Sequence, residues 1–109
     1  MTRNPSSSTL ALSTAFKLLA NVYRRHILHY FYGTEVESAT LSELSSHVQT
    51  TLAEECEEYR IRLRLHHQHL PKLADHNVID YDRRSETVRY WGSSQLETLL
   101  SLTASNNHS

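Results

Sequence analysis

The spacing of apolar residues predicts two helices at the start of the chain. The first is expected over residues 9–20, or from Ser13 if that residue is its cap, with apolar positions at steps of three and four residues. These positions are Leu12, Phe16 and Leu19. A second helix is expected over residues 22–32, because Asn21 is a good N-cap and Gly33 is a typical stop signal.

A short third helix is predicted after a loop over residues 34–39. Thr40 and Glu43 have the spacing of a capping box, in which the hydroxyl accepts a bond from an amide of the first turn and the glutamate reaches back to the cap. The apolar residues that this helix would bury are Leu41, Leu44 and Val48. The helix is therefore expected to face the core along one side.

The longest helix is predicted from Glu55 or Tyr59 to Asn77. Thr51 and Glu54 repeat the capping-box spacing before it, and the acidic residues there suit the positive end of a helix dipole. One face is expected to carry Tyr59, Leu63, His66, Leu70, Leu73 and Ala74. The other face would carry Ile61, Arg64, Leu65, Gln68, Lys72 and Asp75.

Two features within this segment oppose a regular helix. Residues 59–65 alternate with period two, as a strand would, but the helical spacing continues to Leu73 and favours a helix. Pro71 removes an amide donor and restricts Leu70 before it, so a kink or a restart of the helix is expected there.

Residues 69–91 carry the most informative pattern in the chain. The end of the long helix runs directly into two short apolar runs, residues 78–82 and 87–91, which are joined by a polar turn over residues 83–86. A helix that leads into a small hairpin after two earlier helices is the layout of a winged helix-turn-helix. The predicted fold class is α+β, with a three-helix core, a two-stranded wing and an extra C-terminal helix.

The extra helix is expected near the end of the chain, opened by a capping box of Ser94 and Glu97. Its leucines Leu96, Leu99 and Leu100 project to one side of a helix too short to be stable alone. We assign these three to a homodimer interface, with packing against the chain's own core as the alternative. A two-fold dimer would place two recognition helices about one DNA turn apart.

Composition predicts one small cytoplasmic domain. The 109 residues suit a domain over residues 9–104, between disordered tails at residues 1–8 and 105–109. The single cysteine, Cys56, cannot form a disulfide within the chain and suits a reducing compartment. No apolar run has the features of a signal peptide or the length of a membrane span, so no membrane partner is expected.

Two stretches resemble known prokaryotic regulators. LLANVYRRHIL, residues 18–28, resembles the opening helix of ArsR-type winged-helix regulators. HLPKLADHNVIDYD, residues 69–82, resembles the end of their recognition helix and their first wing strand, with Asn77 where glycine is usual. The whole of residues 13–91 is similar to a family of short haloarchaeal winged-helix proteins whose molecular function is not established. The resemblance implies a winged-helix fold and a regulatory role.

A winged helix inserts the exposed face of its third helix into the major groove, where arginine and glutamine bind the edges of guanine and adenine. The residues predicted to bind DNA from this helix are Arg60, Arg62, Arg64, Gln68 and Lys72. Arg83 and Arg84 at the hairpin tip would contact phosphate or the minor groove. The expected partner is double-stranded DNA, and the expected function is that of a DNA-binding transcriptional regulator.

The charge balance keeps a rival interpretation open. With 11 lysines and arginines against 12 aspartates and glutamates, the net charge is −1, so the chain is not a polycation that coats DNA. The acidic cluster of Glu54, Glu55, Glu57 and Glu58 would repel a phosphate backbone. The rival is a winged-helix module that binds another protein through this cluster and the aromatic residues of the second helix. Those residues are Tyr23, Tyr30, Phe31 and Tyr32.

Neither a cofactor, a metal site nor an enzymatic activity is expected from the sequence. His66, His67 and His69 cluster near Cys56, but they diverge around a helix and cannot converge on one ion. His66 is expected on the core face of that helix, with His67 and His69 on its two flanks. The sequence has no glycine-rich phosphate loop, no HExxH motif and no nucleophile elbow.

Overall fold

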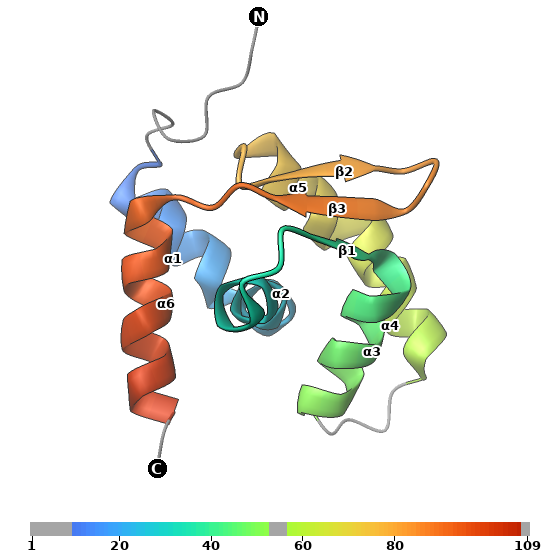
Figure 1. Ribbon diagram of the computed structural model, residues 1–109, viewed down its shortest axis with the longest axis horizontal. Helices are drawn as coiled ribbons and strands as arrows, with labels where there is room; N and C mark the ends of the chain where they lie inside the picture. Colours follow the sequence, from blue (N-terminus) through green and yellow to red (C-terminus); the bar gives the residue numbers. More distant parts are fainter. Residues whose placement is uncertain (1–9, 53–56, 108–109) are drawn as a thin grey trace, which may run out of the picture.

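The computed structural model describes residues 10–52 and 57–107. The helices are α1 (Leu12–Ala20), α2 (Val22–Thr34), α3 (Leu41–Leu52), α4 (Glu58–Arg64), α5 (Leu70–Asp75) and α6 (Ser94–Asn107). The strands are β1 (Ser38–Thr40), β2 (Ile79–Asp82) and β3 (Thr87–Tyr90), and a π-helical turn, η2 (Leu65–His69), joins α4 to α5. The chain is thus α+β, with a small sheet beside a helical core (Figure 1). Within the described ranges, no helix has the length and apolar character needed to cross a membrane.

The three strands form one antiparallel sheet in the order β1-β3-β2. Val88 at its centre pairs with Ala39 of β1 and with Tyr81 of β2, and its side chain is fully buried. The predicted hairpin is confirmed, but the predicted loop over residues 34–39 is wrong at its end, because residues 38–40 add a third strand. Such a short strand shows no alternating pattern of its own and is defined by its pairing with β3. This order of elements is compatible with a winged-helix fold.

Helix α2 lies at the centre of the helical core. Figure 1 shows it end-on, with α6 and α1 on one side and α3 and α4 on the other. Its side chains Ile27, Leu28 and Phe31 are almost completely buried. A helix enclosed in this way holds the segment from α4 to α5 and the terminal helices in one core.

The C-terminal helix α6 packs against α1 and α2, and it continues past the domain boundary expected at residue 104. Leu96 and Leu100 are fully buried within the chain, and Leu99 is partly buried against the same core. The first two leucines are therefore core residues and not exposed contacts of a dimer. The apolar side of a short helix must be covered, and here the chain's own core covers it.

The predicted ends of the first two helices are only partly correct. Helix α1 begins at Leu12, so Ser13 lies inside it and is not its cap. Asn21 caps α2 as predicted, because its side-chain oxygen accepts bonds from the amides two and three residues later, at 2.9 and 3.3 Å. The stop predicted at Gly33 is wrong. The helix continues through Gly33 to Thr34. Glu35 then caps it with a left-handed backbone (φ 58°), and the Glu35 amide donates to the carbonyl of Phe31 at 2.9 Å.

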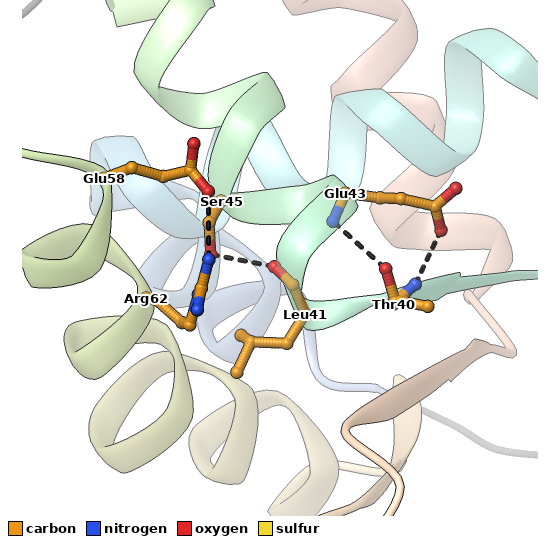
Figure 2. Close-up of polar contacts among 6 residues, drawn as sticks. All are labelled: Thr40, Leu41, Glu43, Ser45, Glu58 and Arg62. Atoms are coloured by element: carbon orange, nitrogen blue, oxygen red, sulfur yellow. Dashed lines mark hydrogen bonds and ion pairs between the residues drawn. The ribbon is translucent and has the colours of Figure 1, made fainter.

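The capping box before α3 is confirmed. The amide of Thr40 donates to Oε1 of Glu43 at 2.8 Å, and the amide of Glu43 donates to Oγ1 of Thr40 at 3.1 Å (Figure 2). Because Thr40 is also the last residue of β1, the strand passes into the helix without a loop. The box predicted at Thr51 is wrong in its first member, since Thr51 lies inside α3, and Glu54 is outside the described residues.

The capping box predicted for α6 from Ser94 and Glu97 is wrong, because neither side chain makes its expected bond. Ser93, and not Ser94, is the cap, because its hydroxyl oxygen accepts a bond from the amide of Leu96 at 3.0 Å. The carboxylate of Glu97 instead accepts a bond from the hydroxyl of Tyr90 at 3.0 Å. This contact ties the start of α6 to the end of β3.

The longest predicted helix is present but irregular. In η2, an amide donates to a carbonyl five residues earlier, and Pro71 follows within the first turn of α5. Since proline has no amide to donate, the predicted disturbance of the helix is confirmed, and it takes the form of a wider turn. Helix α5 ends at Asp75, and Asn77 has the left-handed backbone (φ 62°) expected of a residue that replaces glycine.

Candidate nucleic-acid interface

The outward face of α4 is not the predicted one. Ile61 and Leu65 are fully buried, whereas Tyr59 and Leu63, which were expected on the core face, are 52% and 50% exposed. At 100° per residue, Leu63 lies opposite the direction shared by Ile61 and Leu65. After the extra residue of η2, the inner face continues with His69, Leu70 and Leu73, which are all buried. The predicted face assumed one regular helical spacing through this turn.

The residues predicted to bind DNA from this segment differ in their surroundings. Those with exposed side chains are Arg60, Arg64, Gln68 and Lys72. Arg64 also turns toward α2, with Nη1 3.4 Å from the hydroxyl of Tyr23 and its guanidinium carbon 5.7 Å from the centre of that ring. Arg62 forms an ion pair with Glu58 at 3.1 Å (Figure 2). This pair lies on the side of α4 that packs against α3.

The hairpin places two more cations beside the helix. The carboxylate of Asp82 accepts bonds from the amides of Arg84 and Ser85 at 3.0 and 3.4 Å, which fixes the turn. Arg83 Nη2 donates to the carbonyl of His66 in η2 at 3.4 Å. Both arginines are exposed. The side chain of Arg83 therefore links the turn of the hairpin to the middle of the helical segment.

Two histidines of η2 lie differently from the prediction. His69, and not His66, is the buried one, with 2% of its surface exposed and its Nδ1 3.4 Å from Nη1 of Arg24. Burial, and then the charges of Arg24 and Arg64, lower the pKa of His69 to about 4. His66 is half-buried and forms a hydrogen bond with the hydroxyl of Tyr81, which ties η2 to β2.

Histidine and carboxylate side chains in the described ranges do not form a group of three or more that could hold a metal ion. Cys56, the remaining candidate ligand, lies outside these ranges. His69 faces an arginine from α2, and the half-buried His66 faces a tyrosine from β2. Their geometry therefore shows contacts between elements and not a shared centre.

The residues of the rival interpretation are largely engaged within the chain. The aromatic residues of α2, two of them buried and two partly buried against the core, are Tyr23, Phe31, Tyr30 and Tyr32. In the acidic cluster, Glu57 is exposed and Glu58 is paired with Arg62, while Glu54 and Glu55 are outside the described residues. Of these aromatic residues, only Tyr30 and Tyr32 are therefore partly exposed.

The chain belongs to a family described as a domain of unknown function, DUF7344, whose model matches residues 16–89. The match extends from α1 to β3, so it includes the helical segment, the hairpin and all three strands of the sheet. Neither the curated proteins nor the solved structures include a match to this chain.

Proposed function

We propose that the protein is a DNA-binding transcriptional regulator of winged helix-turn-helix type. In this proposal α4, η2 and α5 form the recognition helix, and β2 and β3 form the wing. The order of the elements supports it, because α2, β1, α3, the recognition helix and the hairpin follow one another and the sheet has the order β1-β3-β2.

The contact between the hairpin and the recognition helix carries this proposal. Arg83 reaches the carbonyl of His66 at 3.4 Å, so the exposed cations of the hairpin and of the helix belong to adjoining surfaces. Such a surface suits the phosphates of a duplex, because lysine and arginine release condensed counterions when they bind there. The net charge of −1 does not oppose this, since binding depends on where the charges lie.

We also propose a homodimer, with contacts other than the buried leucines of α6. Helices α1 and α6 pack together and leave Leu12, Phe16 and Leu102 52%, 56% and 57% exposed. Large apolar side chains on two adjoining helices suit a second copy of the chain, because a two-fold contact covers both copies of the patch at once.

A selection from genome fragments at near-native salt tests the proposed DNA binding. The wild type should enrich discrete sequences, and its affinity should fall steeply as salt is added. Lys72→Ala should weaken binding to all sequences about equally and reduce the salt slope by about one. Lys17→Ala is the matched control, because it removes the same charge from an exposed position on α1. A selection that enriches nothing would favour the protein-interaction module instead.

A further inference from the structure

We infer that the recognition helix reads thymine through the side chain of Leu63. The preferred site would then carry a thymine methyl group opposite the centre of α4, with Tyr59 covering the same region. This inference rests on the proposed DNA binding and goes beyond it, because it assigns a base preference to one residue.

Leu63 occupies the centre of the outward face of α4. It lies opposite the buried Ile61 and Leu65, and half of its surface is exposed. Tyr59 is one turn before it and is equally exposed, so the two form an adjoining apolar pair. Among the described residues, the other large hydrophobic side chains that are exposed lie on α1, on α6 and in the loop before β1.

Cations border this apolar pair on the side toward η2, while Glu57 and Glu58 precede Tyr59. Arg60 is exposed one turn from Leu63 along the helix, Arg64 is exposed next to it, and Arg83 reaches η2 from the hairpin. An apolar patch bordered by cations complements a duplex, whose phosphates flank the edges of the bases. We therefore assign this face to DNA and not to an apolar protein partner.

The chemistry of the major groove narrows the base that could face Leu63. The base edges present hydrogen-bond donors and acceptors, and the C5-methyl of thymine is the apolar group among them. Placing leucine against a donor or acceptor would remove water from that group without replacing its hydrogen bond, which is unfavourable. Placing it against a methyl group buries apolar surface on both sides.

Replacement of thymine by deoxyuridine isolates this methyl group, since it leaves the hydrogen-bonding edge unchanged. Each thymine of a sequence enriched by the selection is replaced in turn, and the affinity of the full chain is measured by fluorescence anisotropy. At one position or more, the replacement should weaken binding about fourfold, which corresponds to one buried methyl group. Leu63→Ala should bind the thymine duplex and the deoxyuridine duplex with equal affinity. Leu63→Met should keep most of the difference in affinity between them.

Gln68→Ala is the control on the same segment. It should alter the preference at an adenine and keep the difference between thymine and deoxyuridine. Leu63 is exposed, so its variants should melt at the wild-type temperature, which circular dichroism checks. If DNA binds but no thymine is sensitive, or if Leu63→Ala keeps the difference, the inference is wrong and the proposed function stands. If no sequence is enriched, both are wrong.

Discussion

The inner and outer faces of the segment from α4 to α5 are built in different ways. On the inner face, Ile61 and Leu65 are fully buried, and the buried His69 contacts an arginine of α2. On the outer face, Leu63 and Tyr59 remain half exposed beside charged residues. Packing therefore determines the inner residues, whereas the fold does not require the chemistry of the outer ones. The residues of the outer face are therefore available for contact with a ligand.

The strongest test of this contrast makes the same change on both faces. Leu65→Ala removes fully buried methyl groups and leaves a cavity, so it should lower the free energy of unfolding by about 2–5 kcal/mol. Leu63→Ala, only two residues earlier, should change it by no more than about 0.5 kcal/mol, because that side chain is half exposed. Urea denaturation measures both. Similar losses in the two variants would contradict the assignment of the faces.

A second test uses the protonation of the inner face. Burial and the nearby arginines lower the pKa of His69 to about 4 in the folded chain, while an unfolded histidine titrates near 6.5. Between these values the unfolded chain binds more protons, so the free energy of unfolding should fall as the pH decreases from about 6.5 to about 4. The contribution of His69 is at most about 3 kcal/mol and levels off at lower pH.

Unfolding at a series of pH values measures this dependence in the wild type and in His69→Gln. In His69→Gln the free energy of unfolding should depend less on pH than in the wild type. Some dependence should remain, because burial also lowers the pKa of His26, His29 and His47. His67→Gln is the control on the exposed side of η2 and should behave as the wild type. If His69→Gln has the same pH profile as the wild type, the pKa of His69 is not lowered in the folded chain and the prediction is wrong.

The parts of the fold that sequence could predict depend on contacts between near neighbours. The cap at Asn21, the capping box of Thr40 and Glu43, and the hairpin turn each involve residues only two or three positions apart. A local pattern is sufficient for them, because the donor, the acceptor and the backbone geometry are all within one turn. The hairpin of β2 and β3 was predictable for the same reason.

The remaining features depend on contacts between distant segments. Strand β1 exists because β3 pairs with it, and His69 is buried because Arg24 and Tyr23 of α2 lie against it. The inner face of α4 had a local signal in the four-residue step from Ile61 to Leu65, but η2 interrupts that spacing before α5. A wider turn of this kind has no pattern of apolar residues that distinguishes it from a regular helix.

The smallest effect is expected at the ion pair on the flank between the two faces. Arg62 Nη2 lies 3.1 Å from Glu58 Oε1, and the two side chains are 41% and 36% exposed. Water and salt screen such a pair, and exposed pairs one helical turn apart contribute about 0.3–0.5 kcal/mol. A double-mutant cycle with Glu58→Ala and Arg62→Ala should give a coupling energy of that size, which should shrink in 1 M salt (a Debye length of about 3 Å). A coupling energy well above 1 kcal/mol that does not respond to salt would place this flank with the inner face, and Arg62 would then be a structural residue rather than a candidate for DNA contact.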